Sequence, residues 1–218
     1  MFAHINVTPN TVHRQEYFLV DNMLQIEPTR IERDLLGEKQ IPLHSYYGIH
    51  TLRAIENFKI SGLAVGQQTH FIRALAQVKK ASAQANLHFQ KLSEQTSTAI
   101  QKACDELIQH PEAWQTAFPL DPYQGGAGTS INMNTNEVIA NIALEMSGHQ
   151  KGDYHILHPN DHVNTSQSTN DVYPTALRLA TYSSLDELLS VLKALIDCID
   201  HKAAEFEYVI KMGRTQLQ

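Results

Sequence analysis

A glycine-rich turn at residues 125–128 (GGAG), followed by Thr129 and a predicted helix, has the composition of an anion site. Consecutive small residues leave backbone N–H groups free to point at one ligand, and the following helix adds the positive end of its dipole. The turn matches neither a Walker loop nor the GxGxxG dinucleotide fingerprint. It therefore predicts either a carboxylate or phosphate site or a glycine turn that binds nothing.

A second polar segment, SQSTND at 166–171, directly precedes the longest predicted helix and contains Ser168, Thr169 and Asn170. Neutral hydroxyl and amide groups at a helix start can donate to a carboxylate and accept from an ammonium group of the same ligand. The same residue types also cap helices. The segment therefore predicts a small-molecule pocket or a well-capped helix start.

The loop HPNDHVN contains His158 and His162, four residues apart, together with Asp161. This spacing could hold zinc on a helix, but Pro159 disfavours helical backbone at His158 and no HExxH pattern is present. We therefore expect no metal here. The loop is predicted to form a second anion site from His158, Asn160 and Asp161, or a hydrogen-bonded connection.

The last polar motif, with Thr215 and Gln216, follows a predicted helix over 174–212. Pro174 is tolerated in a first turn, and no other Pro or Gly occurs before Gly213. Such a helix would be ~58 Å long at 1.5 Å per residue, so polar groups at its two ends cannot meet within one chain. No Ser-His-Asp or Cys-His arrangement is legible, which leaves elimination or addition assisted by hydrogen-bond donors.

The elements that position these motifs are mostly helical. Pro and Gly residues between 27 and 62 indicate turns and a short strand or two, and the spacing after 67 predicts two amphipathic helices, the second starting near Ser93 or Ser97. Asn134 and Glu137 have capping-box spacing before a helix that Gly148 closes. The apolar positions of the two helices are Phe71, Leu75, Val78, Ala81 and Ala85, then Ile100, Ala103 and Leu107.

The long helix carries two rows of large apolar residues, too many for a surface helix on one domain. It therefore needs partner helices, which we expect both from other subunits and from a longer natural chain. The rows are Leu185, Leu192, Ile199 and Phe206, with Leu189, Ile196, Ala203 and Ile210 beside them.

The composition of the 218 residues excludes several classes: 42% are hydrophobic and 18% charged, which is typical of a globular protein. A net charge of −6 argues against nucleic-acid or anionic-membrane binding. Cys104 and Cys198 show no metal or disulfide spacing. No leader or membrane segment is evident, so we expect a cytoplasmic protein whose residues 1–26 form an extension without chemistry.

Five strings of the chain resemble, in order and spacing, the amino-terminal half of the aspartate ammonia-lyases of the aspartase/fumarase superfamily. GAGTS instead of GSGTQS, and Ser168-Thr169-Asn170 instead of Ser-Ser-Asn, are similar to aspartases and not to fumarases. The resemblance runs from about Thr29 to Gln218. The strings are RIERDLLGE, YYGIHTLRAIENF, GGAGTSINMNTNEVIANIALE, HPNDHVNTSQSTNDVYPT and KMGRTQLQ.

The resemblance implies reversible conversion of L-aspartate to fumarate and ammonia without an organic cofactor; divalent-ion activation stays open. Thr129, Ser168 and Asn170 would bind the substrate carboxylates, with Thr169 near the amino group. Thr215 and Gln216 would join them from a second subunit of a homo-oligomer, a tetramer in the full-length protein.

The implied fold is mainly α and aspartase-like. It has an extension over 1–26, a mostly helical domain with short strands over 27–165, and over 166–218 the first long helix of a central multi-subunit bundle. The family's base serine and a carboxylate-binding lysine would lie beyond Gln218, so we expect this chain alone to be inactive. The alternatives are a class II fumarase-type hydratase and a truncated helix-bundle subunit without activity.

Overall fold

The computed structural model describes residues 27–214 and 216–217, so the extension predicted over 1–26 lies outside the described residues. The chain divides into two compact units, 1–45 and 46–218. The predicted domain boundary between 165 and 166 falls inside the second unit, and the division of the whole protein stays a prediction. Within the described part, the mainly α fold is confirmed.

The described part of the first unit is a β-hairpin. Strand β1 (Thr29–Asp34) pairs antiparallel with β2 (Gly37–Pro42). Gly37 has a φ of +112°, a backbone conformation that side chains disfavour, and it follows the tight turn. From β1, the Arg30 guanidinium donates to the Glu32 carboxylate at 2.8 Å and to the Ser45 carbonyl at 2.8 Å. The expectation of short strands in this region is confirmed.

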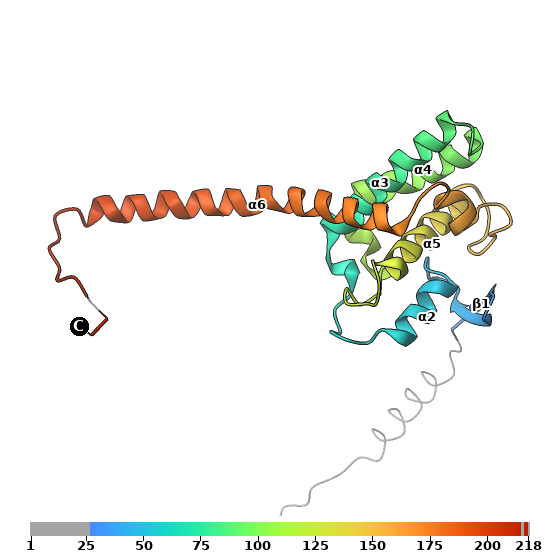
Figure 1. The fold of residues 1–218 in the computed structure, drawn as a ribbon, viewed down its shortest axis with the longest axis horizontal. Helices are drawn as coiled ribbons and strands as arrows, with labels where there is room; N and C mark the ends of the chain where they lie inside the picture. Colours follow the sequence, from blue (N-terminus) through green and yellow to red (C-terminus); the bar gives the residue numbers. More distant parts are fainter. Residues whose placement is uncertain (1–26, 215, 218) are drawn as a thin grey trace, which may run out of the picture. The chain divides into compact units, whose positions relative to one another are not determined.

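The second unit consists of helices joined by short turns, and Figure 1 shows α3 and α4 side by side with α5 next to α4. The Ser93 hydroxyl caps α4 by accepting from the Thr96 N–H at 3.1 Å, so the predicted start near Ser93 is confirmed. The helices are α2 (Ile49–Asn57), α3 (Thr69–His88), α4 (Glu94–Gln109), α5 (Thr129–Met146) and α6 (Thr169–Glu205), and the short turns are η1 (Val65–Gln67), η2 (Pro111–Ala117) and η3 (Pro159–Val163).

Two apolar clusters hold these helices together. The larger one packs α3, α4 and α5 around Ile72, Ile100 and Ile139, all fully buried. The smaller one joins α3 to the first turns of α6, and there the rings of Phe71 and Tyr173 meet edge to face with centroids 5.4 Å apart. Burial of this apolar surface fixes the start of α6 against the helical core.

A carboxylate anchors the loop between α2 and α3. The Asp121 side chain accepts hydrogen bonds from the backbone N–H groups of Ile60, Ser61 and Gly62 at 2.5–3.2 Å, and from that of Tyr123 at 2.9 Å. Burial alone would raise the pKa of Asp121, but these hydrogen bonds stabilise the charged form and lower the pKa to about 2.

Helix α5 begins at Thr129, earlier than the capping-box spacing of Asn134 and Glu137 predicted. Both residues lie in mid-helix and are buried, so the capping-box interpretation was wrong. The Asn134 amide instead donates to the Ala117 carbonyl at 3.0 Å. The helix starts early because Gly128, in a left-handed conformation, forms its N-cap.

Helix α6 runs over Thr169–Glu205, shifted toward the amino terminus from the predicted 174–212. The helix starts five residues before Pro174 because Ser168 supplies the cap, its hydroxyl accepting from the Asn170 N–H. At 1.5 Å per residue its 37 residues extend ~55 Å. The expectation of one long unbroken helix is confirmed.

Beyond its first three turns α6 extends away from the other helices (Figure 1). All described residues from Ser184 onward are exposed, including Leu185, Leu192 and Ile199 of the predicted apolar rows. The side chain of Glu187 reaches back to His70 on α3, with 3.1 Å between the carboxylate oxygen and Nε2.

None of the described helices combines the length and the apolar character needed to cross a membrane.

Candidate functional site

The amino-terminal ends of α5 and α6 lie next to each other, which brings the first two predicted motifs together. Gly128 has a φ of +83°, and a Cβ atom built there would stand 2.3 Å from Cδ2 of Tyr173 on α6. Only glycine permits this approach. One turn further along α5, the Asn132 amide donates to the Thr169 hydroxyl at 3.0 Å. Two positive helix ends therefore converge on one region.

The start of α5, directly after the glycine-rich turn, keeps fewer free backbone donors than a bare helix end would. The side-chain carbonyl of Gln124 accepts from the backbone N–H groups of Ser130 and Ile131 at 3.1 and 3.4 Å. Thr129 is exposed, and no hydrogen bond to its side chain occurs among the described residues. Gln124 therefore already occupies part of the positive end of α5, and the exposed Thr129 hydroxyl is left for a ligand.

The hydroxyl groups at the start of α6 include the predicted helix cap, and their role in ligand binding stays a prediction. The Ser168 oxygen accepts from the Asn170 N–H at 3.2 Å, and the Thr169 oxygen accepts from Asn132. A hydroxyl that accepts a hydrogen bond still has a proton to donate. The exposed side chains of Ser168 and Asn170 are accessible to a ligand. This end of α6 therefore presents donors, which suits a carboxylate.

Behind this surface lies a fully buried lysine that the sequence analysis missed. The Lys79 ammonium on α3 donates to Oδ1 of Asn164 at 2.9 Å and to Oε1 of Gln167 at 3.0 Å. The Asn132 amide donates to the same Asn164 oxygen at 3.2 Å. Burial lowers the pKa of Lys79 to about 7, partly offset by the nearby Cys104 thiol, whose own pKa burial raises.

A signal for Lys79 was present in the sequence. The stripe of α3 that is buried passes through Ile72, Ala76, Lys79 and Ala83, at steps of four, three and four residues. The predicted apolar face included Ala81 and Ala85 instead, and both of these residues are exposed. Continuing the helical spacing from Ile72, whatever the residue type, identifies Lys79.

The histidines of the HPNDHVN loop act within the loop itself. Nδ1 of His158 accepts from the backbone N–H groups of Asn160 and Asp161 at 3.2 and 3.1 Å, and Nδ1 of His162 accepts from the His158 N–H at 2.8 Å. The side chains of Asn160 and Asp161 are exposed. The hydrogen-bonded connection is therefore present, and the second anion site at His158, Asn160 and Asp161 stays a prediction.

Residues 27–214 and 216–217 contain no group of three or more His, Cys, Asp or Glu side chains that could hold a metal ion.

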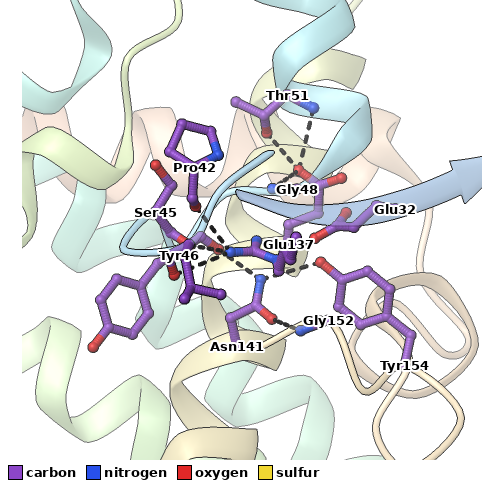
Figure 2. Close-up of polar contacts among 12 residues, drawn as sticks. Glu32, Pro42, Ser45, Tyr46, Gly48, Thr51, Glu137, Asn141, Gly152 and Tyr154 are labelled. Carbon is purple, nitrogen blue, oxygen red and sulfur yellow. Dashed lines mark hydrogen bonds and ion pairs between the residues drawn. The ribbon is translucent and has the colours of Figure 1, made fainter. Parts of the chain in front are cut away.

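Two buried polar residues of α5, Glu137 and Asn141, bind backbone groups at the start of α2 and near Gly152, as Figure 2 shows. The Glu137 carboxylate caps the start of α2, accepting from the Gly48 N–H at 2.8 Å and from the Thr51 hydroxyl at 2.6 Å. The Asn141 amide donates to the Tyr46 carbonyl at 2.8 Å and accepts from the Gly152 N–H at 2.8 Å. These contacts fix α5, and with it the Thr129 end of the helix.

Two further predicted site residues, Thr215 and Gln216, come after α6 in the sequence. Gln216 is exposed and follows α6 in the chain, whereas Thr169 is the first residue of that helix. Thr215 lies outside the described residues. The structure thus brings together the surroundings of Thr129 and Thr169 but does not bring Gln216 to them.

Known proteins resemble this chain in sequence. A family model described as lyase matches residues 37–218. The aspartate ammonia-lyase of Escherichia coli (strain K12) is 54% identical over 189 residues, which are 87% of this chain and 39% of that protein. The aspartate ammonia-lyase of Corynebacterium glutamicum is 56% identical over 189 residues, 87% of this chain and 36% of that protein. The chain therefore spans well under half the length of these curated relatives.

Solved structures show the same likeness in three dimensions. A fumarate lyase:delta crystallin from Brucella melitensis has a TM-score of 0.84 and 53% identity, covering 88% of this chain and 44% of that one. A recombinant class II fumarase from Schistosoma mansoni has a TM-score of 0.75 and 36% identity, covering 88% and 40%. Because the family model matches well over half of the residues and the helical fold agrees, this chain belongs to the lyase family of the aspartase/fumarase superfamily.

Proposed function

We propose that this chain forms part of an aspartate ammonia-lyase, which removes ammonia reversibly from L-aspartate to give fumarate. The sequence supports this function over fumarate hydration, since identity is 54% to the aspartate ammonia-lyase of E. coli but 36% to the class II fumarase of S. mansoni. The observation that carries the proposal is the pair of hydroxyls, Ser168 and Thr169, that are held by protein donors and keep their protons for a ligand.

The proposed substrate is a dicarboxylate, and carboxylate oxygens only accept hydrogen bonds. Thr129, Ser168 and Asn170 would donate to these oxygens beside two positive helix ends, and Thr169 would lie near the amino group. Removal of a proton next to the β-carboxylate produces a doubly charged, enediolate-like group. Donors already aligned toward that charge lower the barrier by roughly 3 kcal/mol each in comparable sites.

Assembly of the site requires further chains in this proposal. The exposed apolar rows of α6, among them Leu185, Leu192 and Ile199, would pack against α6 helices of other subunits in a homotetramer. Antiparallel packing would carry Thr215 and Gln216 of one subunit to the Thr169 end of another. The ~55 Å length of α6 makes this exchange necessary if both ends bind one substrate. A cytoplasmic location remains part of the proposal.

The test is fumarate formation, followed by absorbance near 240 nm, with L-aspartate or L-malate as substrate and the protein that the natural gene encodes. We expect reaction with L-aspartate, and about a tenfold or greater loss of kcat/KM for Thr169→Ala and Ser168→Ala. Thr175→Ala is the matched control, since Thr175 is exposed on the same helix outside the site.

Two results of this assay would contradict the proposed function and favour another one. Preferred reaction with L-malate would identify a fumarase-type hydratase, and reaction with neither substrate would favour a helix-bundle subunit without activity. Light scattering separates these cases further, because a defined tetramer supports the shared site and a monomer contradicts it.

A further inference from the structure

Lys79 is a buried basic residue to which the proposed chemistry gives no role. Its side chain is fully buried, and among the described residues its hydrogen-bond partners are two amide oxygens, those of Asn164 and Gln167. A charged amine loses the free energy of hydration on burial, and hydrogen bonds to neutral amide oxygens compensate less of that loss than a carboxylate would. Lys79 therefore opposes folding when charged, so its presence calls for a reason other than stability.

Both partners of Lys79 belong to the segment that leads into α6. Between them lies Ser166, with a φ of +58°, a conformation that residues with side chains rarely adopt. Such a residue keeps its conformation only where the surroundings enforce it. The Lys79 ammonium bonds on both sides of Ser166, so it is placed to enforce this bend.

The bend is linked to the proposed donors by a short chain of hydrogen bonds. Lys79 donates to the Asn164 oxygen, Asn132 donates to that same oxygen at 3.2 Å, and the Asn132 amide also donates to the Thr169 hydroxyl at 3.0 Å. Gln167 is tied to the loop as well, because its amide donates to the Val163 carbonyl at 2.8 Å. Ser168 follows Gln167 directly.

We propose that Lys79 is a positioning residue: by holding the amides of Asn164 and Gln167 around the left-handed Ser166, it sets where the Ser168 and Thr169 hydroxyls stand for a dicarboxylate ligand. The ligand class in this inference rests on the proposed function. The positioning itself does not, because it concerns contacts between described residues of one chain.

The experiment compares Lys79→Met with Lys80→Met in the protein that the natural gene encodes. Lys80 is the neighbouring lysine, partly exposed and paired with Asp105 at 2.5 Å, so the same substitution there leaves the buried network intact. Gln167→Met removes one partner of Lys79 from the opposite side, and keeps the proposal testable if Lys79→Met does not fold.

Amide hydrogen exchange is the first readout. We expect Lys79→Met to lose protection selectively in residues 164–170, by about tenfold or more, while α4 and the rest of α5 keep theirs. Gln167→Met should reproduce the pattern and Lys80→Met should not. Unchanged protection in 164–170, or an equal loss across all helices, would overturn the proposal, because a merely structural lysine affects the whole core.

Steady-state kinetics with L-aspartate are the second readout. KM should rise about tenfold in Lys79→Met and in Gln167→Met, with a smaller change of kcat, and the double variant should be no worse than either single variant. Additive effects would show that the two residues act separately and would count against the proposal. If the wild-type protein does not react with L-aspartate, the proposed function fails and hydrogen exchange alone decides the role of Lys79.

Discussion

Replacing Gly128 by alanine tests whether the two helix ends meet as closely as the structure shows. Gly128 combines a φ of +83° with a hypothetical Cβ only 2.3 Å from Tyr173 Cδ2. Gly126 provides a matched control, because its φ is +78° and a Cβ there has no atom within 4 Å. Both substitutions carry the same backbone strain, and only Gly128→Ala adds a clash.

The expected magnitudes follow from these two contributions. Left-handed backbone costs an alanine about 1–2 kcal/mol, so Gly126→Ala should lower the free energy of unfolding by that amount. Overpacking against a ring held in place adds roughly 1–3 kcal/mol. Gly128→Ala should therefore cost about 2–5 kcal/mol in total. The ring of Tyr173 packs edge to face against Phe71, so a shift of the ring that relieves the clash would weaken this contact.

Urea unfolding of the two variants, followed by circular dichroism, measures the difference. The double variant Gly128→Ala/Tyr173→Ala should show a favourable coupling, because removal of the ring relieves the clash. Equal destabilisation by Gly126→Ala and Gly128→Ala would refute the reasoning, and so would an absence of coupling. Either result would mean that the starts of α5 and α6 are further apart than described.

Four further substitutions test other features. Lys79→Met should remove a pH dependence of the free energy of unfolding. Burial lowers the pKa of Lys79 from 10.5 to about 7, so between these values the unfolded chain binds more protons and wild-type stability rises with pH. The rise is on the order of 5 kcal/mol in the limit, and urea titrations at pH 7 and 10 would measure it. Asp121→Asn should remove the stability that wild type has above pH 4 and loses as pH falls toward 2, measured by acid unfolding. Glu137→Gln should cost about 3 kcal/mol in urea unfolding, because one oxygen that receives N–H groups becomes a donor. Leu192→Glu should lower the mass measured by light scattering, whereas Lys193→Glu on the same exposed helix should not.

Element types could be predicted from sequence where local signals decide them. Ser93 before a periodic run marks the start of α4, and the absence of Pro and Gly after Pro174 marks one long helix. The start of α5 could not be placed from the spacing of Asn134 and Glu137. Both residues bind groups far away in the chain, and only the folded structure shows those partners.

Part of the candidate site could also be predicted from local sequence signals. Thr129 and Thr169 belong to segments whose polar composition is visible in the sequence, and they do lie at neighbouring helix ends. Lys79 was missed because a lysine is ordinarily exposed. Its burial depends on amide oxygens 85 and 88 residues further along the chain, at Asn164 and Gln167, a separation that periodicity cannot report.

The buried asparagines on opposite sides of α5 have a consequence for how uniquely the chain folds. An apolar helix surface can be rotated by one residue, 100° about its axis, and still find apolar contacts. In α5 the same rotation would separate the amides of Asn132, Asn134 and Asn141 from their acceptors, each at a cost of about 1–3 kcal/mol. The asparagines thus select a single rotational register for the helix. Replacing them with leucine should yield a chain that remains helical but populates several packing arrangements, visible as multiple resonances per residue.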